Sequence, residues 1–326
     1  MYKILQKYLF SLDPEKAHAL TLDSLWFAEK IGLTKLFVKP IIKPVQVMGL
    51  TFPNLLGLAA GLDKNGDYID ALGSLGFGFI EIGSVTPRPQ EGNPKPRLFR
   101  LEKQNAILNR MGFNNKGVAH VVQQLQKIKY RGILGINIGK NKDTPNENAL
   151  NDYVEVFRKV AKYASYVTIN ISSPNTANLR DLQHGELLQL LLRGMKKEQA
   201  IFFETNKKYV PLVVKISPDL APSELQNMAE IFLQEKIDGV IATNTTMTTT
   251  KDEGAGGLSG QPLMSLSTTV LKQLHNILQN NIPIIGCGGI FSGIDAKEKL
   301  ASGASLLQIY SGLVYRGPEL IREILK

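Results

Sequence analysis

Uncharged hydrogen-bonding side chains crowd one segment of the chain, residues 168–176, where an apolar, strand-like run ends. They could surround a flat, neutral, polar ligand from several sides, so we expect a binding site there. Metal ions prefer carboxylates, imidazoles or thiolates, and this segment contains none, so we expect no metal centre. The side chains concerned are Asn170, Ser172, Ser173, Asn175 and Thr176.

Two lysines, Lys64 and Lys215, stand at the ends of other strand-like runs. An ammonium group is costly to bury without a partner, which favours a role for each of them. The possible roles are anion binding, stabilisation of a reduced-flavin anion, or a Schiff base with a carbonyl substrate. The structural alternative is a salt bridge to a nearby acid such as Asp63.

Histidine and paired carboxylates are missing from the predicted strand ends. The four histidines, His18, His120, His184 and His275, fall in predicted helices or loops. A general base would therefore have to be serine, lysine or tyrosine, and a serine hydroxyl is a poor base unaided. This pattern favours a reaction in which a cofactor carries most of the electronic change.

Glycine-rich turns follow the last two strand-like runs, at Gly288-Gly289 and at Ser311-Gly312. Backbone N–H groups in such turns can hold a phosphate, since glycine has no side chain to block the approach. Ordinary tight turns are the alternative for either pair alone. A phosphate-bearing flavin would suit both these turns and the amide-rich segment.

Eight short apolar runs alternate with helical patterns, as expected for a (β/α)₈ TIM barrel whose ligands bind at the carboxyl ends of the strands. A doubly wound open sheet is the competing architecture, but the Gly-x-Gly-x-x-Gly turn typical of it is absent after the first run. The predicted strands are residues 55–59, 79–82, 133–136, 167–171, 212–216, 240–242, 282–285 and 306–309. The predicted helices between them are residues 68–75, 117–127, 153–164, 186–205, 223–234, 265–278 and 293–301.

Two long connections interrupt this alternation. Residues 84–112 form a Pro- and Gly-rich insertion of the kind that roofs an active site. Residues 246–260 are rich in Thr and Gly, and we expect a mobile loop there.

The first 40 residues differ in character from the rest, and we treat residues 1–40 and 41–326 as separate domains. An amphipathic helix is expected first, and Asp13-Pro14 then reads as the N-cap and first position of a second helix with a wider apolar surface. Residues 1–45 hold seven lysines against four acids. The pair either caps the barrel or lies in a membrane surface, and the sequence leaves both open. Residues 45–47 and 50–52 could form a hairpin that closes the barrel floor.

Composition limits the class of protein. With 326 residues, 43% of them hydrophobic, the chain can build a large core, and its single cysteine, Cys287, excludes an internal disulfide. The net charge of +9 comes without an arginine-rich run or an interleaved aromatic patch, so we expect no nucleic-acid partner. No run is apolar enough for a membrane span, and the first seven residues are too charged for a signal core.

Six motifs together resemble dihydroorotate dehydrogenase, in particular its membrane-associated, quinone-reducing class 2. The resemblance covers nearly the whole chain. Ser173 stands where the soluble class carries cysteine, and that class lacks the N-terminal helical extension. The motifs are Ala-Gly-Leu-Asp-Lys at 60–64, Pro-Arg-Leu-Phe-Arg at 96–100, Asn-Arg-Met-Gly-Phe at 109–113, Ile-Asn-Ile-Ser-Ser-Pro-Asn-Thr at 169–176, Gly-Gly-Leu-Ser-Gly at 256–260 and Gly-Cys-Gly-Gly at 286–289.

The resemblance implies oxidation of (S)-dihydroorotate to orotate in pyrimidine biosynthesis. Ser173 would take a proton from C5 while C6 gives a hydride to FMN, Thr176 would help to relay the proton, and Lys64 would take part in catalysis. The implied substrate contacts are Lys64, Asn109, Arg110, Met111, Gly112, Phe113, Asn170, Asn175, Asn244 and Thr245.

The resemblance also implies the cofactor and the electron acceptor. A membrane quinone would enter between the N-terminal helices, past His18, Arg100 and Tyr310. Relatives often carry threonine in place of Ser84, and both residues offer a hydroxyl. The implied FMN contacts are Ala60, Gly61, Leu62, Asp63, Lys64, Ser84, Asn137, Asn170, Lys215, Thr243, Gly260, Gly289, Tyr310 and Ser311.

On this interpretation the N-terminal lysines favour an anionic membrane surface. We expect a monomer that lies peripherally on the cytoplasmic side of a bacterial inner membrane. Three rival hypotheses remain: a soluble-class flavin barrel using fumarate or NAD, an aldolase or isomerase using Lys64 or Lys215 as an amine nucleophile, and a non-catalytic binding protein at the membrane.

Overall fold

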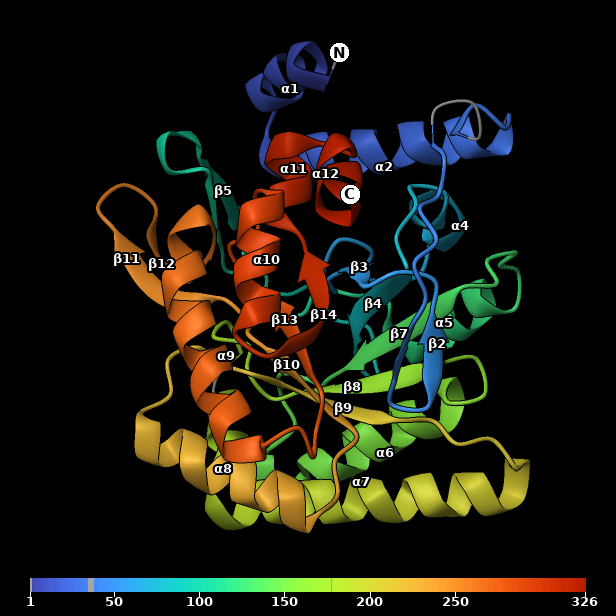
Figure 1. Ribbon diagram of the computed structural model, residues 1–326, viewed down its shortest axis with the longest axis vertical. Helices are drawn as coiled ribbons and strands as arrows, with labels where there is room; N and C mark the ends of the chain where they lie inside the picture. The colour runs from blue at the N-terminus through green and yellow to red at the C-terminus, as the bar shows by residue number, and fades with distance from the viewer. Residues whose placement is uncertain (1, 35–37, 177) are drawn as a thin grey trace.

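A closed barrel of eight parallel strands forms the centre of the computed structural model, which describes residues 2–34, 38–176 and 178–326 (Figure 1). The strands lie around the barrel in chain order, and all eight were predicted. Most of their residues are fully buried, because helices cover the outside and side chains fill the inside. The barrel strands are β3 (Leu56–Leu58), β4 (Phe79–Val85), β7 (Ile133–Ile138), β8 (Tyr166–Asn170), β9 (Leu212–Ile216), β10 (Gly239–Ala242), β13 (Ile284–Cys287) and β14 (Ala304–Ile309).

Helices follow the strands where the 3.6-residue periodicity predicted them, which confirms the TIM barrel. The longest, α7, places its apolar face on α6 and α8 and exposes the other face. The helices around the barrel are α4 (Ile69–Gly73), α5 (Gly117–Leu125), α6 (Ala149–Val160), α7 (Gly185–Asn206), α8 (Pro222–Gln234), α9 (Met264–Leu278), α10 (Gly293–Ala301), α11 (Ser311–Arg316) and α12 (Glu319–Leu325). Single 3₁₀ turns are η1 (Glu102–Gln104), η2 (Asn146–Asn148), η3 (Leu179–Gln183) and η4 (Gln261–Leu263).

The floor of the barrel is closed by the predicted hairpin, β1 (Val45–Val47) and β2 (Leu50–Phe52). Phe52 is fully buried and meets the ring of Phe79 edge-on at 5.1 Å between centroids. Phe79 in turn contacts Tyr166, so aromatic rings from β4 and β8 fill the amino-terminal mouth. Ligands can therefore enter only from the opposite, carboxyl end.

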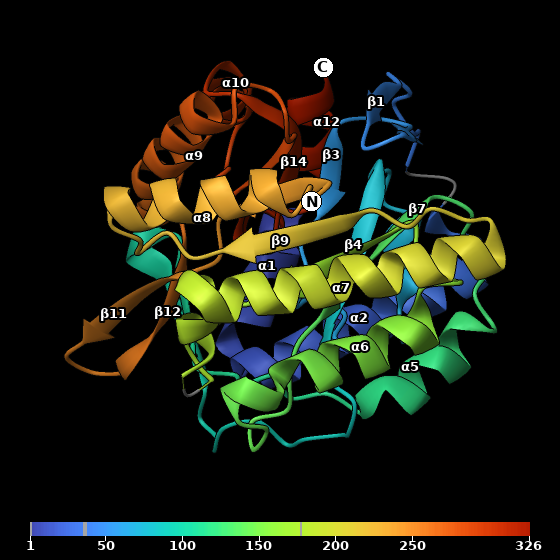
Figure 2. The same cartoon turned by 90° about the horizontal axis from the view of Figure 1, so that it is seen from below.

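Above that carboxyl end lies a four-stranded antiparallel sheet in the order β11-β12-β6-β5. Its strands β5 (Leu98–Leu101) and β6 (Ala106–Asn109) come from the long insertion, which roofs the barrel as expected. Strands β11 (Thr246–Thr250) and β12 (Gly254–Gly260) come from the segment expected to be a mobile loop. That expectation missed the β-pairing. The sequence pattern is weak because four of the seven residues of β12 are glycine, so apolar and polar side chains do not alternate. The strand that β12 pairs with, β6, lies far away in the chain. The β11–β12 hairpin projects from the side of the molecule in both views (Figures 1 and 2).

Two helices precede the barrel, α1 (Tyr2–Ser11) and α2 (Pro14–Lys30), and they lie at the end of the molecule opposite α7 and α8 (Figure 1). Asp13 caps α2 by accepting a hydrogen bond from the Lys16 N–H at 3.0 Å, as predicted. α2 packs on α4 and β5, and Leu22 joins the barrel core. α1 contacts α11, where the Tyr2 hydroxyl donates to the Val314 carbonyl. No helix in the described part of the chain is long and apolar enough to cross a membrane.

Candidate functional site

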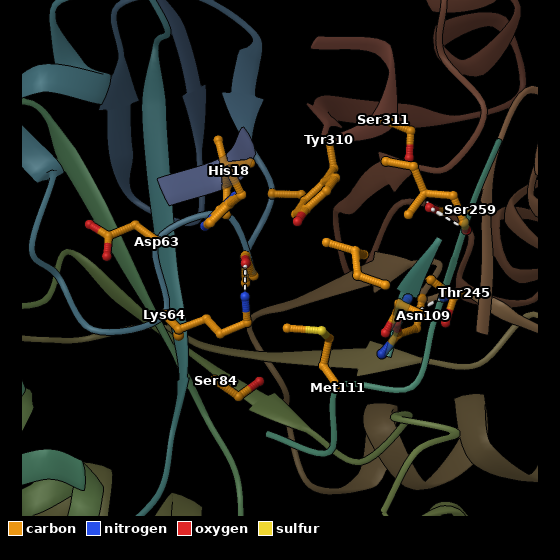
Figure 3. A pocket seen from close by; sticks show the side chains of 18 of the residues that line it. His18, Asp63, Lys64, Ser84, Asn109, Met111, Thr245, Ser259, Tyr310 and Ser311 are labelled. Atoms are coloured by element: carbon orange, nitrogen blue, oxygen red, sulfur yellow. Dashed lines mark hydrogen bonds between the residues drawn. The ribbon is translucent and has the colours of Figure 1, made fainter. Parts of the chain in front are cut away.

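One cavity of about 780 Å³ runs from the first turn of α2 to the barrel axis and passes beneath the β5–β6 roof (Figure 3). A volume of this size is typical of sites that hold a cofactor together with a substrate. Most residues singled out from the sequence line it, although they come from nearly every strand end. They are His18, Ala60, Gly61, Leu62, Asp63, Lys64, Ser84, Asn109, Met111, Gly112, Phe113, Asn170, Ser173, Asn175, Lys215, Thr243, Asn244, Thr245, Gly260, Gly289, Tyr310 and Ser311.

Four of the predicted site residues lie behind the cavity wall. Arg110 donates to the carbonyls of Glu253 and Ala255, so it secures the β11–β12 turn. Arg100 donates to carbonyls at the end of α1 and stacks on Phe10. Asn137 and Thr176 are buried one layer below the surface of the cavity.

A network of neutral amides and hydroxyls joins the ends of β4, β7 and β8. The Asn170 amide donates to Ser84 Oγ at 2.9 Å and to Asn137 Oδ1 at 3.2 Å. Asn244 donates to Ser172 Oγ at 3.0 Å and thereby ties β10 to the same network. These groups are fixed by one another, so they are held in place before any ligand binds.

The same network rests on a carboxylate that sequence reasoning missed. Glu81 is fully buried and accepts hydrogen bonds from Asn137 (2.8 Å), Tyr166 (2.9 Å) and Gln308 (2.8 Å). With its amide nitrogen bound to Glu81, Gln308 leaves its oxygen buried beside the cavity without a partner among the described residues. The available signal was one polar residue in each of two otherwise apolar predicted strands, residues 79–82 and 306–309.

Ser173 lies on the segment that leaves β8 and is 7% exposed at the cavity wall. Its Oγ accepts the Asn175 N–H at 3.3 Å, and within the described residues it has no hydrogen bond to an imidazole or a carboxylate. Thr176 follows one turn later, and its buried Oγ1 has no hydrogen-bond partner in the described chain. A second hydroxyl therefore stands near Ser173 with its bonding capacity unused.

Asn175, which follows the carboxyl end of β8, and Asn109, in the roof sheet, meet across the cavity. Asn175 donates to Asn109 Oδ1 at 3.1 Å, and Asn109 donates to the Gly257 carbonyl at 3.2 Å. Asn109 ends β6 and Gly257 belongs to β12, so the roof sheet positions one side of the site. The facing amides can pair with both the N–H and the C=O edges of a planar ring.

Lys64 does not form the salt bridge to Asp63 considered as its structural alternative. Its ammonium donates to the Gly61 carbonyl at 2.8 Å, while the Asp63 carboxylate points the other way (Figure 3). Asp63 instead accepts the backbone N–H groups of four residues, at 65–68. It thus shapes the loop that carries Lys64 and leaves the ammonium facing the cavity. Burial lowers the pKa of Lys64 to about 8, so the side chain is largely cationic at neutral pH.

Two titratable side chains of α2, His18 and Glu15, border the mouth of the cavity. Burial, and then the Lys64 ammonium, lower the pKa of His18 to about 4, so the imidazole is neutral at pH 7. Glu15 forms salt bridges with Arg97 at 2.7 Å and with Lys95 at 3.2 Å. The buried Arg97 side chain also donates to the Asn93 carbonyl, so one ion pair fastens α2 to the roof insertion.

Two features of the cavity wall fit a flavin that carries a phosphate group. Lys215 is a buried cation at the cavity wall, with no hydrogen bond or ion pair to any residue that the structure describes. Gly289 has φ +78°, and a Cβ there would lie 2.4 Å from the Met264 nitrogen. The turn can therefore pack directly against the start of α9 at the cavity wall. A planar ring with amide edges would fit near Lys215, and a phosphate would fit near Gly289.

Comparisons with known proteins agree with this geometry. The sequence profile of a family described as dihydroorotate dehydrogenase matches residues 43–326. A protein of Saccharophagus degradans named dihydroorotate dehydrogenase (quinone) is 55% identical over 99% of this chain and 97% of its own. One of the same name from Acinetobacter baylyi is 55% identical over 99% and 98% of the two chains.

Solved structures give the same grouping. The crystal structure of DHODH from Eimeria tenella in complex with ferulenol has a TM-score of 0.85 and 37% sequence identity to this chain. The similarity covers 96% of this chain and 90% of that one. The likeness therefore extends beyond the barrel into the N-terminal helical region.

Proposed function

The chain belongs to the dihydroorotate dehydrogenase family, and from that premise we propose which of its residues hold FMN, bind the substrate and move the proton. It is an oxidoreductase that converts dihydroorotate to orotate in pyrimidine biosynthesis with a quinone as electron acceptor. The observation that carries the residue assignments is the single cavity that joins the barrel axis to α2.

FMN would lie across the carboxyl ends of the strands. Ser84 and Thr243 would face its ring, Asn137 would hold Ser84 and Asn170 from behind, and the Lys215 ammonium would lie beside the ring's polar edge. Gly260, Gly289 and Ser311 would surround the phosphate. When bound, FMN accepts a hydride from the substrate and delivers the electrons to the quinone. The remaining proposed contacts are Ala60, Gly61, Leu62, Asp63, Lys64, Asn170 and Tyr310.

Dihydroorotate would lie between the amides at the carboxyl ends of the barrel strands and those of the roof sheet. Asn109 and Asn175 already face each other there, and Asn170 and Asn244 are fixed by the strand-end network. The Lys64 ammonium would pair with the substrate carboxylate. The other proposed contacts are Met111, Gly112, Phe113 and Thr245, and Arg110 would act by holding the β11–β12 turn.

Ser173 is the proposed base that accepts the proton from C5. A serine hydroxyl needs an outlet for the proton, and the unpartnered Thr176 Oγ1 provides the nearest free hydroxyl in the segment. Burial of both residues keeps bulk water away from C5. The protein thereby holds a low-dielectric site in which the transfer is directed along two hydroxyls.

The quinone would enter between α1 and α2, past His18 and Tyr310. His18 and Tyr310 line the cavity, whereas Arg100 would act by holding the end of α1. We extend the proposal to residues 1–40 as the quinone-access unit and residues 41–326 as the catalytic unit. The protein would be a monomer lying peripherally on an anionic membrane surface, on the cytoplasmic side of a bacterial inner membrane.

Substitution of the proposed base tests the catalytic assignment. Ser173→Ala should lower the rate at which dihydroorotate bleaches the flavin absorbance by about a hundredfold or more, with bound FMN unchanged. Ser173→Cys, which restores an ionisable group at the same atom, should recover part of that rate. An alanine variant that bleaches at the wild-type rate would remove Ser173 from the mechanism.

A further inference from the structure

Lys299 is a buried cation outside the site described above. It lies on α10, is fully buried, and donates from Nζ to Ser267 Oγ at 2.6 Å. No carboxylate lies within ion-pair distance of its ammonium in the described part of the chain. An ammonium buried with only a neutral hydroxyl as partner is costly to the fold, and that cost calls for an explanation.

The acids nearest in sequence are used elsewhere. The carboxylate of Asp295, on the first turn of α10, accepts the Phe291 N–H at 2.8 Å. The backbone N–H of Asp295 donates to Ser292 Oγ, which caps the helix. Glu298 is exposed on the same helix. Neither acid lies within ion-pair distance of the Lys299 ammonium, so both offset its charge only from longer range.

On its other side, Lys299 faces the glycine turn of the cavity. Ser267 Oγ lies within hydrogen-bond distance of the carbonyls of Leu263 (2.7 Å) and Gly288 (3.1 Å). Gly288 has φ +111°, and a Cβ there would lie 2.9 Å from the same Oγ. Ser267 thus joins Lys299 to a turn whose other face lines the cavity.

The cavity face of this turn has no negative charge of its own. It meets the start of α9, a 15-residue helix whose first N–H groups receive no side-chain cap. A helix start, a glycine turn and a buried ammonium all favour an anion at the same place.

We propose that Lys299 is a positioning residue for the FMN phosphate: it holds the Gly288 turn through Ser267 and sets a buried positive charge behind the phosphate. This inference rests on the proposed function, since it requires FMN in the cavity. The phosphate would supply a negative charge closer to the ammonium than the acids of α10 do. Burial lowers the pKa of Lys299 to about 8, so the side chain still carries its charge at neutral pH.

Binding of FMN and of riboflavin, which lacks the phosphate, tests the proposal on the full-length protein stripped of flavin. Lys299→Met keeps most of the side-chain volume and removes the charge. Its Kd for FMN should rise by about tenfold or more, which corresponds to about 1.4 kcal/mol, whereas its Kd for riboflavin should stay within about twofold of wild type. Lys297→Met is the matched control, because Lys297 is exposed on the same helix, and both constants should be unchanged.

Each outcome decides the proposal. Unchanged FMN affinity in Lys299→Met, or equal losses for FMN and riboflavin, would overturn it, because the ammonium would then serve packing alone. Lys299→Gln keeps a donor for Ser267 and is measured in the same way if the methionine variant does not fold. If neither folds, the ammonium serves the fold and the proposal is wrong. Failure of the proposed function would look different, since wild-type protein would then bind no FMN.

Discussion

At the scale of residues, Thr176 is the side chain whose role the geometry makes most open to test. Its Oγ1 is buried without a hydrogen-bond partner in the described chain, close to the proposed base. Thr176→Val keeps the shape and removes the hydroxyl. We expect dihydroorotate-dependent flavin bleaching to slow by about tenfold or more, with a larger effect at low pH, where proton release is hardest.

Stopped-flow absorbance at several pH values measures this. Thr168→Val is the matched control, since Thr168 also has an unpartnered buried Oγ1 but lies within β8 rather than at its end. If both variants bleach at the wild-type rate, Thr176 has no part in the proton path. If both slow equally, the effect is one of packing.

His18 gives a prediction about pH and stability. Burial and then the Lys64 ammonium lower its pKa to about 4 in the folded chain, against about 6.5 when unfolded, and Glu15 and a hydrogen bond with the Leu62 backbone oppose them. The unfolded chain therefore binds the proton first as pH falls. Above pH 6.5 the protonation of His18 does not lower the free energy of unfolding. As the pH falls from 6.5 to 4, this free energy decreases by about 3 kcal/mol at most.

Urea unfolding from pH 7 to pH 4 measures this difference. His18→Asn should lose less stability than wild type over that interval and should match its slope above pH 7. Parallel curves for the two proteins down to pH 4 would mean that His18 is protonated in the folded state as readily as in the unfolded one.

The sequence could predict the cavity residues because their side chains interrupt apolar runs at strand ends. Ser173 and Lys215 stood out in this way, and the structure brings both to the same wall. Glu81 and Gln308 were missed because each lies inside a strand, where a lone polar residue does not reveal which groups it bonds. Distances between side chains far apart in the chain cannot be read from either strand alone.

At the scale of elements, a largely buried ion pair helps to attach α2 to the roof. Glu15 in the first turn of α2 pairs with Arg97, whose side chain is only 8% exposed. Removing one partner leaves the other charge buried, which costs about 3 kcal/mol. Glu15→Gln should therefore lower quinone-dependent turnover more than flavin bleaching by dihydroorotate, because α2 borders only the mouth of the cavity.

Steady-state assays with a quinone and single-turnover bleaching measure the two steps. Lys95→Met is the control: Lys95 also pairs with Glu15, but its side chain is 69% exposed and such pairs contribute little. Equal losses in both steps for Glu15→Gln would show that the ion pair supports the whole site rather than its mouth.

The elements of the barrel were predictable because their periodicity is local, whereas the roof was not. Residues 246–260 read as a loop, yet Gly257 and Leu258 pair with β6 more than a hundred residues away in the chain. Glycine-rich strands lack the side chains that produce an alternating pattern. Only the pairing partner, supplied by the long insertion, turns this segment into a strand.

At the scale of the whole molecule, exposed apolar side chains gather on α1 and α2. These helices lie at one end of the fold (Figure 1), and residues of α2 also line the cavity. Leu5 is 52% and Phe27 60% exposed. Insertion of each into a membrane would contribute about 2 kcal/mol. The double variant Leu5→Gln/Phe27→Gln should therefore bind vesicles of phosphatidylglycerol and phosphatidylcholine roughly a hundredfold more weakly or worse.

Vesicle sedimentation measures this binding, and flavin bleaching by dihydroorotate should stay unchanged because neither residue reaches the barrel axis. The matched control is Leu190→Gln/Phe203→Gln on α7, at the opposite end of the molecule, where the two side chains are 52% and 45% exposed. If the membrane meets the cavity mouth, this control binds vesicles like wild type. Equal weakening by both pairs would mean that apolar exposure in general drives adsorption. The quinone would then have to reach His18 by another route than through a membrane-bound helical pair.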